Sequence, residues 1–310
     1  MKYNYRIDVR ENNDLRANFN ILTREIFGFD FIDWYEKGYW SDKYIPHILA
    51  DNNGKVISNV SVNLMKFDVG GVIKNYIQLG TIMTDSDYRG QGLNKFILEK
   101  VLEEYSGKVD GIYLFGNDSV LNYYPKFGFK ATTEYKYSLK LNKETQTVDE
   151  KQKGYFLKKV DMADNNSREK LFRLIKKFDD VNMGHNPNDG FSMCANLGLY
   201  QFWLTSEFEE SVYYLPEMDA YVIADREASA DLQTGILSVY QIISNQPLDM
   251  GKLALSFAEI SEIKLLFTPI NKELYDFSLH KVEDCTSFIL GDDLERISLE
   301  RLMFPVISHA

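Results

Sequence analysis

A glycine-containing turn between a predicted strand and a predicted helix carries the clearest chemical signal in this sequence. The turn comprises residues 87–94, reads DYRGQGLN and follows the apolar run 77–83. Its glycines let the backbone come close to a ligand, and the unpaired N–H groups of the helix's first turn point at that ligand. The helix dipole adds a partial positive charge, and Arg89 adds a full one. The segment therefore predicts an anion site that suits a pyrophosphate.

Two common phosphate loops are excluded by the residues around the glycines. The turn has no Gly-Lys-Ser/Thr ending, so it is not an NTPase loop, and Lys95 occupies the third glycine position of the dinucleotide fingerprint. The remaining pattern resembles the acetyl-CoA pyrophosphate loop of the GNAT superfamily of N-acetyltransferases, whose longer form is Gln/Arg-x-x-Gly-x-Gly/Ala. Asp87 departs from that form at its first position, and Asn94 stands where a small residue is usual.

A second segment carries the same resemblance. Residues 123–129 read YYPKFGF and follow a predicted strand at 111–115. They are similar to the Phe-Tyr-x-x-Phe-Gly-Phe segment that closes the cofactor site in the GNAT family. The two segments occur in the family's order, with a helix and a strand between them. The resemblance covers residues 1–141 and makes acetyl-CoA the expected acyl donor.

The resemblance also implies which residues form the site. In the family, the strand before the loop binds the pantetheine arm through its backbone, and a backbone N–H there stabilises the oxyanion. The residues that would hold the cofactor are Thr81, Ile82 and Met83 on this strand, then Arg89, Gly90, Gln91, Gly92, Leu93 and Asn94 in the loop, and Asn117 after the next strand. Tyr124 matches the general acid that protonates the leaving thiolate. The alternative for Tyr124 is a packed aromatic side chain at a helix end.

Residues 27–40 wall the acceptor groove in the family, and here they are rich in aromatic and acidic side chains. Asp33 and Glu36, together with Asp30, would suit an amine with an apolar or a positively charged body. The alternative is that the aromatic residues belong to the core and the acids to a solvated helix face. The general base is left open between Asp33, Glu36, His47 and the C-terminal carboxylate of Ala310.

The elements that must position these residues alternate between strands and helices. Apolar spacing predicts strands at 5–9, 45–50, 55–66, 72–84 and 111–115, and helices at 14–27 and after the glycine turn. The fold class that this order implies is α+β, with a mixed, mostly antiparallel sheet and flanking helices, as in the GNAT fold.

The second half of the chain resembles a degenerate repeat of the first. Strand and helix patterns recur in the same order from 155 to 290, but neither the glycine turn nor the YYPKFGF segment has a counterpart. We therefore predict a tandem arrangement with a catalytic GNAT domain at 1–141, a polar linker at 142–153 and a degenerate GNAT-like domain at 154–310.

Composition limits the partners, the cellular location and the metal sites that can be expected. The 310 residues are 45% apolar and 26% charged, with a net charge of −11 that argues against nucleic acid as a partner and mildly favours a cationic substrate. No apolar run approaches the ~20 residues that span a bilayer, so no membrane partner is expected. Cys194 and Cys285 suggest reduced thiols in a cytoplasmic protein. No histidine has metal-ligand spacing to another His or Cys, so no metal is expected. The oligomeric state stays open, a homodimer included.

Three functions fit these observations. The first is an acetyl-CoA-dependent N-acetyltransferase that passes the acetyl group directly to a small primary amine. The second is a tandem-GNAT transferase with a larger acceptor, such as a peptide or a thiol precursor. The third is a non-catalytic acyl-CoA-binding module, in which Tyr124 would be dispensable while Gly90 and Gly92 would not.

Overall fold

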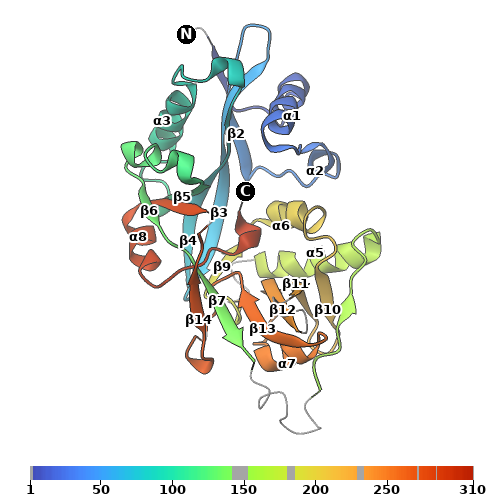
Figure 1. Cartoon of the computed structure of the whole chain (residues 1–310). Helices are drawn as coiled ribbons and strands as arrows, with labels where there is room; N and C mark the ends of the chain where they lie inside the picture. The colour runs from blue at the N-terminus through green and yellow to red at the C-terminus, as the bar shows by residue number, and fades with distance from the viewer. Residues whose placement is uncertain are drawn as a thin grey trace.

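The structure, a computed structural model, describes residues 3–141, 153–179, 186–228, 234–270, 272–283 and 285–309. Two β-sheets lie at opposite ends of the molecule, with helices around them (Figure 1). Within the described ranges, no helix is both long enough and apolar enough to span a membrane.

The first sheet contains the strand that leads into the glycine turn. Its strand order is β1-β2-β3-β4-β5-β15-β6, with β9 paired to the end of β3, and all pairs are antiparallel except β4 with β5. The strands are β1 (Asn4–Arg6), β2 (Tyr44–Ala50), β3 (Val56–Val69), β4 (Val72–Thr84), β5 (Gly111–Gly116), β6 (Lys130–Thr132), β9 (Phe191–Cys194) and β15 (Thr286–Leu290).

The second sheet repeats this layout in part. Its order is β14-β7-β13-β12-β11-β10-β8, and only β12 and β13 run parallel. The strands are β7 (Tyr135–Lys140), β8 (Lys158–Lys159), β10 (Val212–Leu215), β11 (Ala220–Ala228), β12 (Gly235–Ile243), β13 (Ile260–Leu265) and β14 (Ser278–Lys281). In each sheet the parallel pair is joined by a helix, as a crossover requires.

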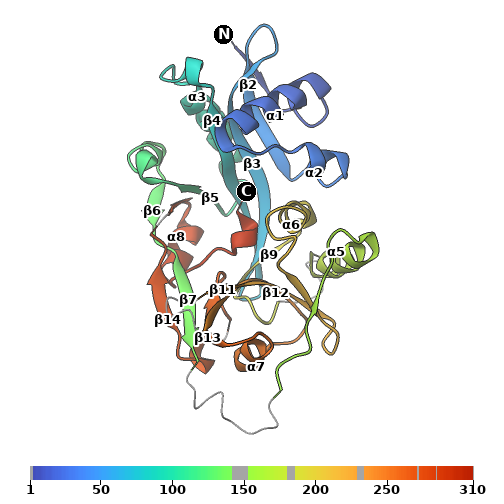
Figure 2. The same cartoon turned by 45° about the vertical axis from the view of Figure 1, so that its right-hand side comes forward.

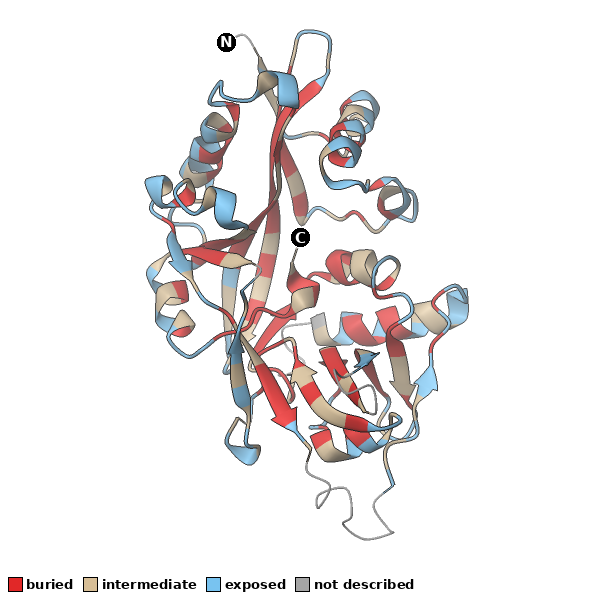
Figure 3. Cartoon of the chain, viewed as in Figure 1, coloured by how far each residue is buried: buried red, intermediate tan, exposed pale blue. Residues whose placement is uncertain are grey.

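The helices cover the sheets. They are α1 (Asn13–Phe27), α2 (Ile32–Glu36), α3 (Leu93–Tyr105), α5 (Asn165–Asp179), α6 (Leu197–Leu204), α7 (Met250–Leu255) and α8 (Asp292–Ser298). Ile48 packs in the cluster that contains α1, whereas its neighbour Leu49 packs in the cluster that contains α3. Because successive strand residues face opposite sides, α1 and α3 cover opposite faces of the first sheet. Figure 3 shows buried residues along its central strands and exposed residues on the outer sides of these helices.

Two strands are exchanged between the sheets. β15, from the end of the chain, lies between β5 and β6 in the first sheet, while β7 joins the second sheet between β14 and β13. Strand pairing thus crosses the predicted boundary at residue 141 in both directions. The division into domains at 1–141 and 154–310 stays a prediction, and residues 142–152 of the predicted linker lie outside the described residues.

The two halves also meet beside α2. Figures 1 and 2 agree in placing α6 between the first sheet's α2 end and the second sheet. The Trp34 indole Nε1 of α2 donates a hydrogen bond to the Gly198 carbonyl of α6 at 2.8 Å. This contact brings α6 to the edge of the predicted acceptor region.

Candidate active site

The predicted phosphate loop connects the end of β4 to the start of α3. Gly90 and Gly92 have φ angles of +75° and +74°, and a Cβ on either would meet no atom within 4 Å. Glycine is therefore favoured here by backbone conformation and not by crowding. Gly92 is the N-terminal cap of α3 and no side chain caps this end. The first N–H groups of the helix thus have no side-chain cap, and the predicted anion site at this turn stays a prediction.

Polar contacts hold this loop in place. Asp85 accepts a hydrogen bond from the Asp87 N–H at 2.9 Å and pairs with Lys55 Nζ at 2.7 Å. Burial alone would raise the pKa of Asp85, but the contacts from Lys55 and the backbone outweigh it and hold the pKa below its usual value. Asn94 Nδ2 donates to the Met83 carbonyl at 3.1 Å and to Thr84 Oγ1 at 3.0 Å. The Asn94 side chain thus ties α3 to β4.

The other predicted loop residues divide between solvent and core. Arg89 is exposed, and its Nε lies 3.2 Å from the Thr84 carbonyl oxygen. Gln91 accepts a hydrogen bond from the Tyr3 hydroxyl at 3.0 Å. Leu93 is buried in the core between α3 and the sheet. Arg89 and the backbone N–H groups are accordingly the groups of this loop that could contact an anion.

A cleft opens where β4 and β5 separate. Their parallel pairing ends at Leu79 and Leu114. Beyond that point lies a pocket of about 390 Å³. Its lining comes from the end of α1, from β4 and β5, from the segment after β5, and from the residue before β15. The lining residues are Phe27, Gln78, Leu79, Gly80, Thr81, Ile82, Phe115, Gly116, Asn117, Ser119, Val120, Tyr124 and Cys285. The predicted cofactor residues Thr81, Ile82 and Asn117 and the predicted acid Tyr124 therefore share one cleft.

A β-bulge interrupts β4 at this cleft. Asn59 and Ser61 of β3 pair with Met83 and Gly80, so that the two residues Thr81 and Ile82 lie opposite the single residue Val60. Thr81 has a φ of +46°, which a β-branched residue rarely adopts. Asn59 Nδ2 donates to the Thr81 carbonyl at 2.7 Å. A bulge of this kind leaves backbone groups unpaired by the ladder and available to a ligand.

Tyr124 lies at the inner wall of the cleft. Its side chain is 5% exposed and its ring packs 5.1 Å from that of Phe288 and 6.0 Å from that of Phe129. Burial, and secondarily the nearby Tyr123, raises the pKa of the Tyr124 hydroxyl well above its usual value. The phenol therefore keeps its proton at neutral pH. The neutral phenol can donate a hydrogen bond, although the raised pKa makes it a weaker acid than an exposed tyrosine.

A second pocket, called the acceptor pocket because part of its lining comes from the predicted acceptor wall 27–40, meets the cleft at the bulge. It has a volume of about 510 Å³ and is lined by residues from both halves of the chain: Phe27, Phe29, Asp30, Phe31, Trp34, Tyr44, Thr81, Leu199, Phe202, Trp203, Ser206, Glu207 and His309. Phe27 and Thr81 line both this pocket and the cleft. The two cavities consequently adjoin at the bulge on β4.

The family model described as "Acetyltransferase (GNAT) domain" matches residues 16–132. This part of the chain is a GNAT acetyltransferase domain. The glycine turn, Tyr124 and every lining residue of the β4–β5 cleft except Cys285 lie within it. The chain thus carries the domain of an acyltransferase family.

Solved structures extend the likeness in fold over nearly the whole chain. Eis1 from Mycobacterium abscessus is 14% identical with a TM-score of 0.58, over 95% of this chain and 74% of that protein. A probable N-acyltransferase from Enterococcus faecalis is 14% identical with a TM-score of 0.56, over 93% and 72%. A GCN5-related N-acetyltransferase from Anabaena variabilis is 14% identical with a TM-score of 0.57, over 93% and 72%. No curated protein matches the sequence.

These structures confirm the predicted fold class. The GNAT domain and the rest of the chain form a mixed, mostly antiparallel α+β structure with flanking helices, like that of the tandem Eis-type fold. At 14% identity the likeness shows the fold and not the substrate.

Asp33 and Glu36 of the GNAT domain lie away from both cavities. The side chain of Asp33 is 84% exposed and its carboxylate lies 3.5 Å from Lys37 Nζ. Glu36 is also exposed, at the end of α2. Neither lines the acceptor pocket, whose acidic lining residues are Asp30 and Glu207. A role for Asp33 and Glu36 in substrate binding stays a prediction.

His47 and His309 differ in their position relative to the two cavities. His47 lines neither cavity; its Nδ1 is 2.5 Å from the Tyr5 hydroxyl, and burial lowers its pKa to about 4. His309 does line the acceptor pocket, stacked on Phe115 with ring centroids 3.8 Å apart. Burial lowers its pKa to about 3, against a weaker opposing effect of the Phe304 backbone. Ala310 lies outside the described residues.

Several lining residues of the acceptor pocket were absent from the sequence prediction. Phe202, Trp203 and Glu207 belong to α6 and the turn after it, and they face residues of the GNAT domain more than 160 positions earlier. The only signal in the sequence is the aromatic-rich run 197–204, which reads LGLYQFWL and looks like an ordinary core helix.

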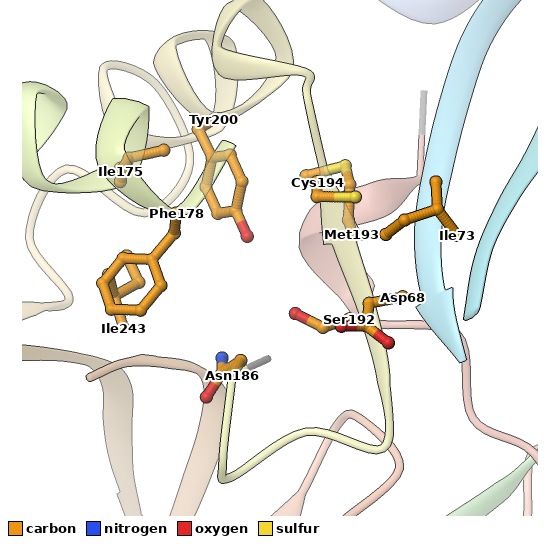
Figure 4. Close-up of a pocket in the computed structure, with 10 residues that line it drawn as sticks. All are labelled: Asp68, Ile73, Ile175, Phe178, Asn186, Ser192, Met193, Cys194, Tyr200 and Ile243. Carbon is orange, nitrogen blue, oxygen red and sulfur yellow. The ribbon is translucent and has the colours of Figure 1, made fainter. Parts of the chain in front are cut away.

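A smaller cavity of about 30 Å³ lies between the two halves, where β9 and the ends of β3 and β4 face α5, α6 and β12. Figure 4 shows the Tyr200 hydroxyl directed into it, opposite Met193 and Cys194 of β9. A space of this size admits a water molecule or two. It is too small for an acyl acceptor. Across the described ranges, no three His, Cys, Asp or Glu side chains gather in a metal-binding group.

Proposed function

We propose that this protein is an acetyl-CoA-dependent N-acetyltransferase that passes the acetyl group directly to a small primary amine. The observation that carries the proposal is the junction of the two cavities at Thr81. A donor in the cleft and an acceptor in the second pocket would meet there without a covalent enzyme intermediate, because each cavity opens onto the same bulge of β4.

The residues of the cleft fit acetyl-CoA. The N–H groups from Gly90 to Asn94 and the Arg89 guanidinium would hold the pyrophosphate, and the Thr81–Met83 backbone and Asn117 would hold the pantetheine arm. Acetyl-CoA supplies the acetyl thioester to this site.

The chain's own groups would then manage charge and protons. The amine nitrogen forms a bond to the acetyl carbon while the carbon–sulfur bond breaks, so the amine loses one proton to water and the thiolate gains one from Tyr124, which water then reprotonates. Backbone N–H groups at the Thr81 bulge would face the developing oxyanion, an interaction typically worth about 3 kcal/mol of barrier. Tyr124, which its raised pKa keeps protonated, would donate a hydrogen bond to the sulfur and release its proton as the thiolate leaves.

Thiol release from acetyl-CoA across a panel of primary amines tests the proposal. We expect amine-dependent release that falls roughly 100-fold in Tyr124→Phe. Tyr123→Phe is the matched control because Tyr123 is its partly exposed neighbour and lies outside the cleft lining. Acetyl-CoA binding without transfer to any amine would overturn the proposal and leave a binding module.

A further inference from the structure

The acceptor pocket is built mainly of aromatic side chains. Seven of its lining residues are aromatic: Phe27, Phe29, Phe31, Trp34, Tyr44, Phe202 and Trp203. Phe31 lies at their centre, with its ring centroid 5.3 Å from that of Phe29 and 5.6 Å from that of Phe202. Rings at these distances and tilts pack favourably and hold one another in place. The pocket therefore presents a preformed apolar wall to its ligand.

Part of this wall faces outward. Phe27 and Phe29 remain 45% and 42% exposed although they are large apolar residues. Their rings lie 6.0 Å apart and both line the pocket, with Phe27 also lining the adjoining cleft. A ligand that covers this exposed apolar surface would bind more tightly, because removing the surface from water is favourable.

The negative charge available in the pocket is small. Asp30 is paired with Arg24, whose Nε lies 3.1 Å from Oδ2, and its Oδ1 accepts the Ile32 N–H at 2.9 Å. Burial would raise the pKa of Asp30, but these contacts hold it below the usual value. Glu207 is the other acidic lining residue, and among the described residues it has no ion pair. One carboxylate is thus free to attract an ammonium group.

The polar groups gather at the end that adjoins the cleft. Thr81 and His309 lie on that side, because Thr81 also lines the cleft and His309 stacks on Phe115, which lines the cleft as well. An acceptor would thus place its nitrogen toward Thr81 and its remaining atoms against the rings.

From these observations we infer that the acceptor is a primary monoamine whose nitrogen is joined by a short chain to an aromatic or similarly flat apolar body. This inference rests on the proposed N-acetyltransferase function. Burying the second and third ammonium groups of a polyamine or an amino sugar against these rings would cost more than one free carboxylate offsets. A flat apolar body instead covers the exposed aromatic surface, and its single ammonium can approach the ring faces before it loses its proton.

The test compares acceptors with the full chain and saturating acetyl-CoA. The probes are 2-phenylethylamine and tryptamine on one side, and spermidine and kanamycin on the other. We expect kcat/KM to be at least tenfold higher for the first two. Phe29→Ala should raise the KM for 2-phenylethylamine about tenfold and leave the KM for acetyl-CoA unchanged. Phe156→Ala is the matched control, since Phe156 is a 64% exposed phenylalanine outside the pocket.

The outcomes separate this inference from the function on which it rests. Faster transfer to spermidine or kanamycin would overturn the aromatic acceptor and leave the N-acetyltransferase function standing. Transfer to none of the four amines, with acetyl-CoA bound in calorimetry, would overturn both. Quenching of tryptophan fluorescence by 2-phenylethylamine gives a second readout, because Trp34 and Trp203 line the pocket. An equal KM in the Phe29→Ala and Phe156→Ala proteins would also overturn the inference.

Discussion

The Tyr44 and Thr81 hydroxyl groups share a hydrogen bond of 2.6 Å across the central strand of the first sheet. Tyr44 lies on β2 and Thr81 on β4, so the Tyr44 side chain reaches past β3 to the bulge. With the Asn59 contact to the Thr81 carbonyl, this bond holds Thr81 in its left-handed conformation. The junction of the two cavities is thereby fixed by side chains from two neighbouring strands.

Tyr44→Phe should impair catalysis more than cofactor binding. The change removes only the hydroxyl that braces Thr81, which is worth about 1 kcal/mol and corresponds to roughly a fivefold fall in kcat. The affinity for acetyl-CoA should stay unchanged, because the pyrophosphate loop is untouched. Steady-state thiol release and calorimetry measure the two effects. A weaker acetyl-CoA affinity with unchanged kcat would contradict this role for the bulge.

Gly92→Glu should abolish acetyl-CoA binding. The new carboxylate would stand at the open N-terminus of α3, where it would repel the pyrophosphate and occupy its place. Gly107→Glu is the matched control, because Gly107 lies beyond the other end of α3 with a φ of +69° and no atom within 4 Å of its Cβ. Both variants carry the same strain and charge. Equal acetyl-CoA affinities by calorimetry would show that the loop does not bind the cofactor.

The positions of the candidate cofactor residues on the sheet could be predicted from sequence because they depend on local segments. Gly90, Gly92 and Tyr124 lie in short segments whose order, strand–turn–helix and then strand–turn, determines where they stand on the sheet. Tyr124 lies in the cleft beside Phe129 and β5, and both are its near neighbours in sequence.

Residues within 27–40, which the sequence predicts as an acceptor wall, do line the second pocket, but the wall that α6 adds could not be predicted because its contacts are long-range. Trp34 meets Phe202 at 5.7 Å only after the second half of the chain has folded. β7 and β15 are equally strand-like in sequence, and nothing in their patterns specifies that they pair with the other half's sheet. The charges of Asp33 and Glu36 favour a role in binding an amine, but the five-residue helix α2 directs both side chains toward solvent and buries Trp34 instead.

Glu134→Gln should stabilise the protein above neutral pH. Glu134 is buried where the chain passes between the two sheets, and its Oε1 accepts the Phe304 N–H at 2.8 Å. Burial raises its pKa from 4.5 to about 7, only partly opposed by hydrogen bonds from Phe304 and Ser287. Since the folded-state pKa is the higher one, its favourable contribution is complete below pH 4.5 and is lost as pH rises to about 7.

Urea unfolding at pH 5 and pH 8 measures this effect. The amide keeps the acceptor oxygen for Phe304 and never ionises, so we expect a gain of up to about 3 kcal/mol at pH 8 and a much smaller one at pH 5. Glu283→Gln removes a nearby exposed carboxylate and should change neither value appreciably. An equal gain at both pH values would contradict a buried, titrating Glu134.

Arg24→Gln should shift acceptor preference toward diamines. Arg24 neutralises Asp30 at the edge of the acceptor pocket, and its side chain is 52% exposed, so its removal should not disturb the fold. The freed carboxylate would attract a second ammonium group with about 1 kcal/mol, the size of a partly exposed ion pair, or roughly a fivefold higher kcat/KM. Ratios of kcat/KM for 1,5-diaminopentane and 2-phenylethylamine measure the shift. Arg6→Gln, which frees the partly exposed Asp8 outside the pocket, should leave the ratio unchanged. The same ratio in both variants would mean that Asp30 does not face the bound amine.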